Sequence, residues 1–260
     1  MTMSRAMEIR GRIIGGGREP LICTPLVART RDELFPELDV VLEKRPDLIE
    51  WRADFYVGLE DVAQVCELSR RLAARAGAIP LIFTIRSTRE GGQPVPLGDE
   101  QVADLCVAVC ETGSMGLIDF EMSAPRGQLE RVRAAARSSG TRLILSYHNF
   151  NETPGDEALY AKFAEARELG GDVAKVAVMP RDVDDVLTLL GATHRASRTL
   201  AMPLISMSMG AYGVLSRVAG WMFGSTVTFA VGRASSAPGQ VPIEELRAML
   251  DTLQRACPGK

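Results

Sequence analysis

Short hydrophobic runs alternate with amphipathic stretches along the whole 260-residue chain. Runs of about four to eight residues rich in Val, Ile and Leu are typical of strands buried in a parallel sheet, and apolar residues three or four positions apart are typical of helices. The pattern predicts eight strands, at residues 21–27, 47–54, 79–86, 116–122, 141–148, 172–179, 202–209 and 226–232. It also predicts a hairpin over residues 7–14 and eight helices, at residues 30–45, 59–77, 98–113, 127–140, 156–171, 182–197, near 213–223 and at 241–256.

Alternation of this kind predicts an α/β fold in which helical crossovers join parallel strands. Eight strand–helix units of about 25 to 30 residues each match a closed (β/α)8 barrel, the TIM barrel. We therefore expect one domain over residues 1–260, a (β/α)8 barrel with a short N-terminal hairpin. An open, doubly wound sheet is the alternative, but the first strand–helix turn lacks the GxGxxG pattern of a dinucleotide site, and the chain has no GxxxxGK[ST] pattern.

The composition excludes several classes of partner. The net charge of −3 shows no basic excess of the kind that a nucleic-acid surface needs. No apolar run reaches the roughly 20 residues that span a bilayer, and the N-terminal segment lacks the features of a signal peptide. The five cysteines lie in apolar stretches, so we expect buried thiols rather than a disulfide framework or a metal site: Cys23, Cys66, Cys106, Cys110 and Cys257. We expect a cytoplasmic protein with no nucleic acid, membrane or metal partner.

Charged residues lie at the ends of strands that are otherwise apolar. In a barrel the catalytic groups are contributed by the C-terminal ends of several strands, which here carry Glu50, Arg52, Arg86, Asp119, Glu121, His148 and Lys175. Side chains two positions apart on a strand share a face, so Glu50 and Arg52 project together. One such charge alone is usually a solvated rim residue, but charged residues are rarely buried as a group without a function. We therefore expect a catalytic role for His148, whereas His194, in a helical stretch, is expected on the surface.

Lys175 is the least expected of these residues, because it interrupts the strand-like run GDVAKVAVMP (171–180). Burial and nearby positive charge would lower the pKa of its ammonium group, and a free amine in an apolar pocket is the nucleophile that forms Schiff bases with carbonyl substrates. With a histidine one strand away, imine formation followed by proton abstraction is indicated, and Arg217 could clamp an anionic group. The alternative is that Lys175 points outward between helices, with its stem buried and its head in water.

Six ordered segments carry a resemblance that spans nearly the whole chain: IEWRADF (49–55), LIFTIRSTREGG (81–92), LSYHNF (145–150), DVAKVAVMP (172–180), SMSMGAYGVLSRVAGWMFGSTVTF (206–229) and SSAPGQ (235–240). In these segments the sequence resembles type I 3-dehydroquinate dehydratase, the Schiff-base enzyme of the shikimate pathway. The resemblance implies a (β/α)8 barrel and a lyase that converts 3-dehydroquinate to 3-dehydroshikimate and water in aromatic amino acid biosynthesis. It also implies a homodimer that requires no cofactor and no metal.

The resemblance assigns roles to individual residues. Lys175 would form the imine with the C3 ketone, and His148 would remove the C2 proton and then donate a proton as the C1 hydroxyl leaves. Glu90 would pair with His148 and tune its basicity. The expected substrate contacts are Glu50, Arg52 and Arg86 with the ring hydroxyls, Met209 with the ring, Arg217 with the carboxylate, and Ser236, Ala237 and Gln240 from a lid at residues 232–240. A Pro/Gly/Ser loop between the last strand and helix is compatible with such a lid, although an ordinary connector has the same composition.

Two departures and two rival functions remain open at this stage. Asn149 stands where the family often has Asp, and the first strand ends in Cys23-Thr24-Pro25, which leaves any polar contact there undefined. A class I aldolase would share the lysine but needs a phosphate site after strands seven and eight, where this chain carries SRVAG (216–220) and the Ser/Ala/Pro segment. A non-catalytic barrel would have lost the lysine–histidine pair, and both residues are present.

Overall fold

The computed structural model describes residues 6–16 and 19–257. Within these residues eight strands form one parallel sheet in the order β10-β3-β4-β5-β6-β7-β8-β9. Their bounds are β3 (Leu21–Leu26), β4 (Leu48–Arg52), β5 (Leu81–Thr84), β6 (Leu117–Glu121), β7 (Arg142–Asn149), β8 (Val173–Val178), β9 (Leu204–Ser208) and β10 (Val227–Phe229). A parallel bridge between Leu204 and Ser225 brings β9 against the segment that leads into β10, so the sheet is a nearly closed barrel.

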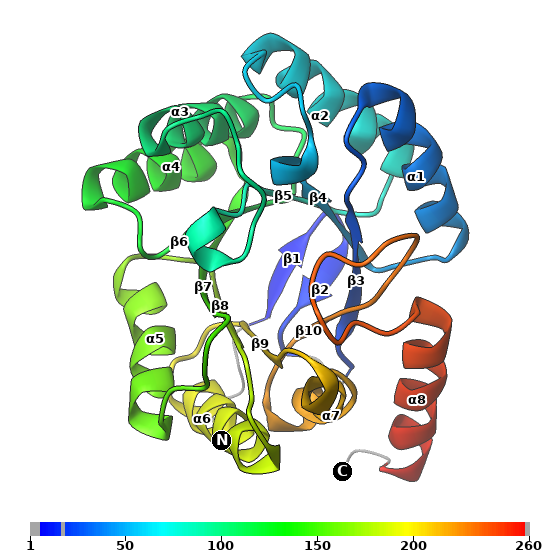
Figure 1. The fold of residues 1–260 in the computed structure, drawn as a ribbon, viewed down its shortest axis with the longest axis vertical. Helices are drawn as coiled ribbons and strands as arrows, with labels where there is room; N and C mark the ends of the chain where they lie inside the picture. Colours follow the sequence, from blue (N-terminus) through cyan, green and yellow to red (C-terminus); the bar gives the residue numbers. More distant parts are fainter. Residues whose placement is uncertain (1–5, 17–18, 258–260) are drawn as a thin grey trace.

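Helices surround the barrel on the outside (Figure 1). They are α1 (Arg31–Glu43), α2 (Val62–Ala76), α3 (Asp99–Glu111), α4 (Arg126–Ser139), α5 (Asp156–Glu168), α6 (Val183–Thr199), α7 (Val214–Ala219) and α8 (Ile243–Ala256). The predicted TIM barrel is confirmed. The ends of the predicted domain at residues 1–5 and 258–260, and the internal residues 17–18, lie outside the described residues.

The helix expected near residues 213–223 is the one element that differs in kind. It is split into a 3-10 turn, η3 (Ala211–Gly213), the six-residue helix α7, and a second 3-10 turn, η4 (Gly220–Phe223). A Cβ atom on Gly213 would lie 2.1 Å from the carbonyl oxygen of Ser208, so the turn into α7 requires glycine. Two further 3-10 turns follow β4 and β5, η1 (Ala53–Phe55) and η2 (Thr88–Glu90).

Strand parity sorts the apolar residues into two layers. Residues that point inward fill the barrel axis: Cys23, Leu48, Ile82, Leu117, Ile144, Val173, Ile205 and Val227. Their strand neighbours, such as Ile49, Trp51 and Phe83, point outward and pack beneath the helices. Burial of apolar area on both faces of each strand is the main stabilising contribution to such a fold.

The predicted N-terminal hairpin is confirmed as β1 (Met7–Ile9) and β2 (Arg12–Ile14), which pair antiparallel. Ile9 and Ile14 pack in the same cluster as the inward residues at the N-terminal ends of the strands, and Figure 1 shows the hairpin behind the barrel. The hairpin therefore closes the N-terminal end of the barrel and leaves the C-terminal end, the mouth, for polar groups.

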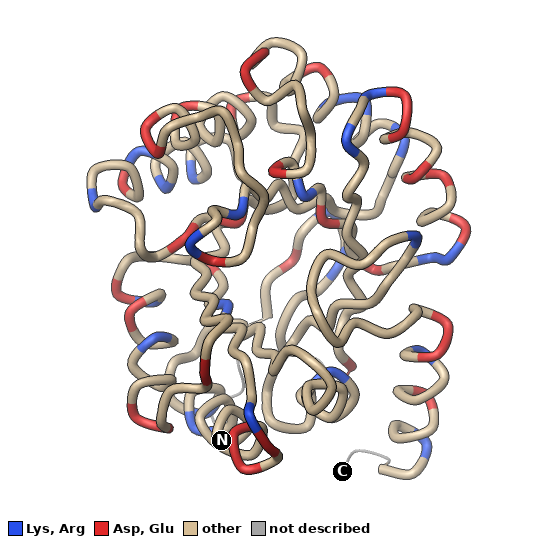
Figure 2. Tube along the Cα trace, in the orientation of Figure 1, with Lys and Arg blue, Asp and Glu red and all other residues tan. Residues whose placement is uncertain are grey.

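Charged residues occupy both the outer helices and the strands around the barrel axis (Figure 2). Cys23, Cys66, Cys106 and Cys110 are free and buried, as expected, but the expectation was wrong for Cys257, which follows the last turn of α8 and is exposed. Across residues 6–16 and 19–257, the helices are all too short or too polar to cross a membrane.

Candidate active site

The orientation of Lys175 follows from its neighbours on β8. Val173 and Ala177, two positions to either side, pack in the barrel interior, whereas Ala174 and Val176 pack against the helices. Lys175 therefore points toward the barrel axis, and it is only 4% exposed. The alternative orientation, outward between helices, is wrong.

The surroundings of Lys175 are more polar than its sequence neighbours indicate. Its Nζ lies 2.8 Å from Oδ2 of Asp119 and 3.4 Å from Oε1 of Glu50, and it sits 4.8 Å from the ring centroid of Phe229. The expectation of an apolar pocket is thus only partly correct, because two carboxylates reach the amine from β6 and β4, strands that are not adjacent to β8. Asp119 and Glu50 therefore compensate a positive charge on Lys175.

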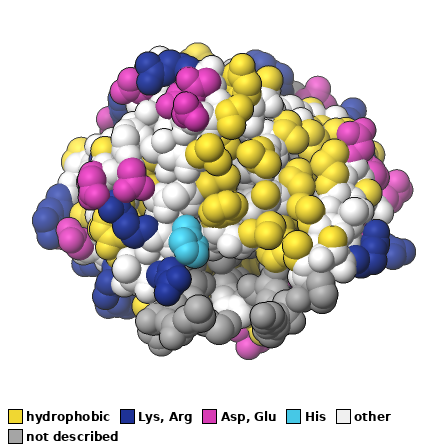
Figure 3. Space-filling view, turned by 90° about the horizontal axis from the view of Figure 1, so that it is seen from below, with side chains coloured by type: hydrophobic (Ala, Val, Ile, Leu, Met, Phe, Trp, Pro, Cys, Tyr) yellow, Lys and Arg dark blue, Asp and Glu magenta, His cyan; other side chains and the backbone are white. Residues whose placement is uncertain are grey.

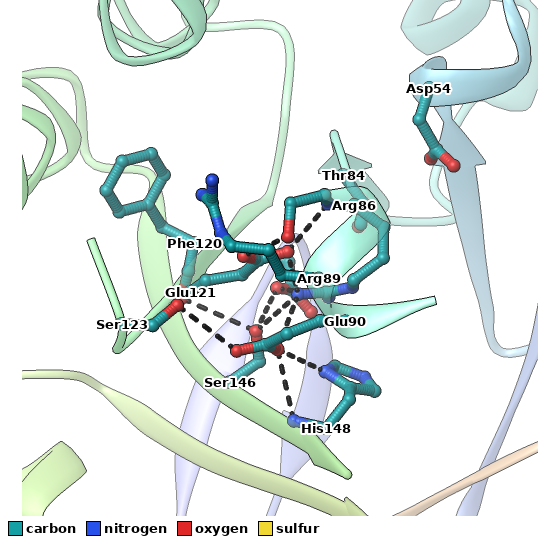
Figure 4. Close-up of polar contacts among 12 residues, drawn as sticks. Asp54, Thr84, Arg86, Arg89, Glu90, Phe120, Glu121, Ser123, Ser146 and His148 are labelled. Carbon is teal, nitrogen blue, oxygen red and sulfur yellow. Dashed lines mark hydrogen bonds and ion pairs between the residues drawn. The ribbon is translucent and has the colours of Figure 1, made fainter. Parts of the chain in front are cut away.

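His148 and Glu90 form a buried pair. Oε2 of Glu90 lies 2.9 Å from Nδ1 of His148 and also accepts the backbone N–H of His148 at 3.0 Å, while the hydroxyl of Ser123 donates to Oε1 (Figure 4). Burial, together with Arg86 and Lys175, holds the pKa of His148 well below its usual range. Burial also raises the pKa of Glu90 to about 7, against the lowering effect of Arg86. The pair thus favours a neutral imidazole whose Nε2 is left for the cavity.

Arg86 joins three strands at the mouth. Its guanidinium donates to Asp119 at 2.7 Å, to the hydroxyl of Ser146 at 2.9 Å and to Glu121 at 3.2 Å (Figure 4). Burial opposes the charge on Asp119, but Arg86 and Lys175 outweigh burial and hold the pKa of this carboxyl well below its usual range. Arg86 borders the cavity, yet most of its donors already have protein acceptors, so it acts first as the cation that organises this network.

Arg217, on α7, is a buried cation of a different kind. It is 2% exposed, and its guanidinium donates to the backbone oxygens of Pro238 at 3.1 Å and Phe229 at 3.5 Å. Among the described residues no carboxylate forms an ion pair with it, and its Nε has no hydrogen-bond partner. Burial lowers the pKa of Arg217 to about 10. A buried, uncompensated guanidinium is a strong site for an anion.

These side chains surround a cavity of about 40 Å³ at the mouth. Ten of the eleven residues predicted for the site line it: Glu50, Arg52, Arg86, Glu90, His148, Lys175, Met209, Ser236, Ala237 and Gln240. Arg217 lies just behind, since its Nη1 contacts Met207 and the backbone of Phe229, and both of these residues line the cavity. The residues predicted for the site from the sequence therefore lie together at one place, the mouth of the barrel.

The loop of residues 232–240, here called the mouth loop, covers this cavity. Arg52 donates to the backbone oxygen of Ser236 at 3.2 Å, and the side chain of Gln240 accepts the N–H of Ser236 at 3.1 Å. Arg52 is itself held by Asp54 through two hydrogen bonds of 2.8 Å. Two arginines of the site, Arg52 and Arg217, thus hold backbone oxygens of the mouth loop.

Asp119, Ser146 and Phe229 were not assigned roles from the sequence, although all three contribute to the site. Asp119 lies two positions from Glu121 on β6, and Ser146 lies two positions from His148 on β7. This spacing, which places each pair on one face of its strand, could have identified Asp119 and Ser146 from the sequence. Asn149 turns away and bonds to Tyr147, and His194 is exposed, as expected. Within the described residues no group of three or more His, Cys, Asp or Glu side chains is arranged to hold a metal ion.

A second cavity, of about 310 Å³, lies on the outer side of the loop after β5, against α3 and α4. Its charged lining residues are Arg89 and Asp99, which pair with each other at 3.1 Å and are exposed, and Glu121, which accepts hydrogen bonds from Arg86 and Ser87. Since the charged side chains that line it are all paired within the described residues, we place the candidate active site at the mouth.

Buried charged side chains at the C-terminal ends of the strands of a (β/α)8 barrel are typical of an enzyme. Here they include a lysine, a histidine paired with a glutamate, and an arginine without a carboxylate partner among the described residues. The chain belongs to the type I 3-dehydroquinase family, whose model matches residues 22–256. It is 50% identical to the 3-dehydroquinate dehydratase of Aromatoleum aromaticum, over 100% of both chains. It superposes on the crystal structure of 3-dehydroquinate dehydratase from Geobacillus kaustophilus with a TM-score of 0.95 and 45% identity, covering 98% of each chain. A type I enzyme from Clostridium difficile, described with covalent modified comenic acid, gives a TM-score of 0.93 at 34% identity, covering 98% of this chain and 100% of that one.

Proposed function

We propose that this protein is a 3-dehydroquinate dehydratase that acts through a Schiff base on Lys175 and serves aromatic amino acid biosynthesis. The observation that carries the proposal is a single cavity bordered by the buried amine of Lys175 and by His148, whose Nδ1 is paired with Glu90, with the guanidinium of Arg217 directly behind its wall. These are the nucleophile, the base and the carboxylate anchor that the reaction needs.

In the proposed reaction, Nζ of Lys175 attacks the C3 ketone and water leaves, which gives a protonated imine. The positive nitrogen withdraws electrons from the adjacent C2, so Nε2 of His148 can take the C2 proton. The electron pair left at C2 expels the C1 hydroxyl, which accepts a proton from His148 and departs as water. Hydrolysis of the imine then releases 3-dehydroshikimate and restores the amine. Glu90, bonded to Nδ1, fixes the ring orientation throughout.

Substrate recognition is proposed to divide among the remaining wall residues. Arg217 would hold the carboxylate, Glu50, Arg52 and Arg86 the ring hydroxyls, and Met209 the ring face. The cavity, of about 40 Å³, is small for a substituted cyclohexane. The mouth loop would therefore open to admit substrate and close over it with Ser236, Ala237 and Gln240, which is the motion of a lid.

We also propose a homodimer located in the cytoplasm. Exposed hydrophobic residues come from α6 and the η3–α7–η4 segment, elements in mutual contact: Val183, Leu187, Tyr212, Leu215 and Met222. Figure 3 shows hydrophobic side chains gathered on the face of the molecule seen from below. Such a patch is compatible with a subunit interface.

The proposal is tested by adding 3-dehydroquinate, reducing with borohydride, and mapping the adduct by mass spectrometry. We expect the added mass on Lys175, and no adduct in Lys175→Ala. His148→Ala serves as the matched variant: it should still form the adduct, while turnover falls by about 10² to 10⁴. Normal turnover by Lys175→Ala without any adduct would overturn the Schiff-base mechanism.

A further inference from the structure

The carboxylate of Asp119 touches three donors and is completely buried. Oδ2 accepts from Nζ of Lys175 at 2.8 Å, whereas Oδ1 accepts from Arg86 at 2.7 Å and from the hydroxyl of Ser146 at 2.6 Å. The donors on Oδ1 fix the orientation of the carboxylate and leave Oδ2 for the lysine. The backbone register of the strands supports these side-chain contacts, because Asp119 pairs with Thr84 on β5 and Ser146 pairs with Lys175 on β8.

We infer that Asp119 is the counter-ion of the Schiff base: its carboxylate balances the positive charge on the nitrogen of Lys175 both before reaction and in the protonated imine. This inference rests on the proposed function and adds a residue to it. A lysine ammonium and a ketone give a protonated imine and one water, with no net gain or loss of a proton. The nitrogen therefore carries one positive charge at both ends of the step, and one fixed anion at 2.8 Å suits both.

Asp119 fits this role better than Glu50, the other carboxylate near the amine. Glu50 lies farther from Nζ, at 3.4 Å, and the same oxygen accepts the hydroxyl of Thr84 at 3.0 Å. Asp119 is also locked in place by a buried cation, because Arg86 and Asp119 are both almost inaccessible to solvent. An anion that is already oriented stabilises this charge without reorganising during the reaction.

The remaining charged and titratable groups around Lys175 come from several elements. Among the described residues, the strands β9 and β10 line the cavity with Met207 and the ring of Phe229, and Arg217 (α7) lies behind these two. The other charged and titratable groups that line the cavity or interact with Lys175 are Cys23 (β3), Glu50 and Arg52 (β4), Arg86 (after β5), Glu90 (η2) and His148 (β7). The positive charges of Arg86 and Arg52 disfavour a positive charge on Lys175. Asp119 opposes this effect, and its carboxylate lies closer to Nζ than that of Glu50.

A counter-ion makes a prediction that a purely structural residue does not. Because Asp119 lies 2.8 Å from the nitrogen and favours the positive charge in the ammonium and in the protonated imine alike, Asp119→Asn should move the pH dependence of both species to lower pH. The first is measured without substrate, as the pH dependence of acetylation of Lys175 by acetic anhydride, quantified by mass spectrometry. The charge of the imine is followed in the presence of substrate, as the decrease at high pH of kcat and of the yield of borohydride adduct. We expect Asp119→Glu to restore part of the shift.

Glu50→Gln is the matched comparison and should give a smaller shift, because its carboxylate is farther from the nitrogen. If Asp119→Asn does not fold, the double variant Asp119→Asn/Arg86→Gln removes both members of the buried ion pair and allows the same acetylation measurement. A loss of activity in Asp119→Asn with an unshifted acetylation profile would overturn the counter-ion. Absence of any adduct in the wild-type protein would instead overturn the proposed function, so the two failures are distinguishable.

Discussion

Arg217 shows how a single residue can serve binding at the expense of stability. The fold lowers its pKa to about 10, below the ordinary value for arginine. For a cation, a lowered pKa means that the folded state disfavours the charge. The penalty is therefore fully present at pH values below about 10. It decreases above pH 10, where the folded protein loses the proton first, and vanishes once the pH exceeds the ordinary pKa and the unfolded chain is neutral as well. At neutral pH it is about 3 kcal/mol, which a bound carboxylate would relieve.

We predict that Arg217→Met is at least as stable as the wild-type protein to urea, because it removes this buried charge while keeping most of the side-chain volume. Its kcat/KM should fall by about 10² to 10³, the usual effect of removing one partner of a buried charge pair. Arg126→Met, whose side chain is 82% exposed, should change neither quantity. A methionine variant that unfolds at a clearly lower urea concentration would mean that the fold itself needs the guanidinium.

At this scale the sequence predicted much of the site, because strand parity determines which side chains share the barrel interior. Glu50, His148 and Lys175 were singled out as charged or titratable residues in predicted strands and lie together, whereas the inward orientation of Lys175 could not be determined from the sequence. The contact between Lys175 and Asp119 was not predicted, because β6 and β8 are separated by β7. Which residues meet across the axis depends on strand tilt and on the stagger between strands, and neither quantity can be obtained from the pattern of one strand.

Among the elements, the mouth loop depends most on a particular backbone geometry. Gly239 has φ of 77°, in the left-handed region, and a Cβ there would lie 2.2 Å from the carbonyl oxygen of Gly210. The neighbouring Pro238 accepts hydrogen bonds from Arg217 and from the backbone N–H of Gly210. Only glycine permits the loop to approach the end of β9 this closely.

We predict that Gly239→Ala raises KM for 3-dehydroquinate, because alanine disfavours the closed loop. The left-handed conformation alone costs about 1–2 kcal/mol for a residue with a Cβ, which corresponds to roughly a 5- to 30-fold increase. Stability should change little, since the loop is at the surface. Gly191→Ala is the control: Gly191 lies in α6 with open space around it, so KM should stay the same. An unchanged KM in Gly239→Ala would show that binding does not require this closed loop.

Helices were predicted well where neighbouring residues in the sequence determine them, and less well where a contact with another element determines them. The predicted helices at residues 59–77 and 182–197 correspond to α2 and α6, which begin directly after the cap residues Asp61 and Asp182; an N-cap of this kind is a local signal. The break of the helix at residues 213–223 depends instead on the contact between Gly213 and Ser208. A glycine inside a helical pattern does not by itself indicate whether its backbone must pass close to a strand.

In the whole molecule, the two ends of the barrel differ in composition: one is lined by charged residues and the other by apolar residues. The mouth holds buried charges, which stabilise a fold poorly, whereas the N-terminal end is apolar and closed by the β1–β2 hairpin. This division is usual for (β/α)8 barrels, in which one end carries the chemistry and the other the stability. It implies that changes at the hairpin should alter unfolding without altering the reaction.

Two adjacent isoleucines of β2 allow this division to be measured. Ile14 is 1% exposed within the interior cluster, whereas Ile13 is 60% exposed. We predict that Ile14→Ala lowers the free energy of unfolding in urea by about 2–4 kcal/mol, as expected for a buried large-to-small substitution, while Ile13→Ala changes it by less than about 1 kcal/mol. Both variants should keep the wild-type kcat and KM at temperatures where they are folded. If Ile14→Ala lowered kcat in a fully folded protein, the packing at the closed end would extend its influence to the position of Lys175, and the separation of the two ends would be wrong.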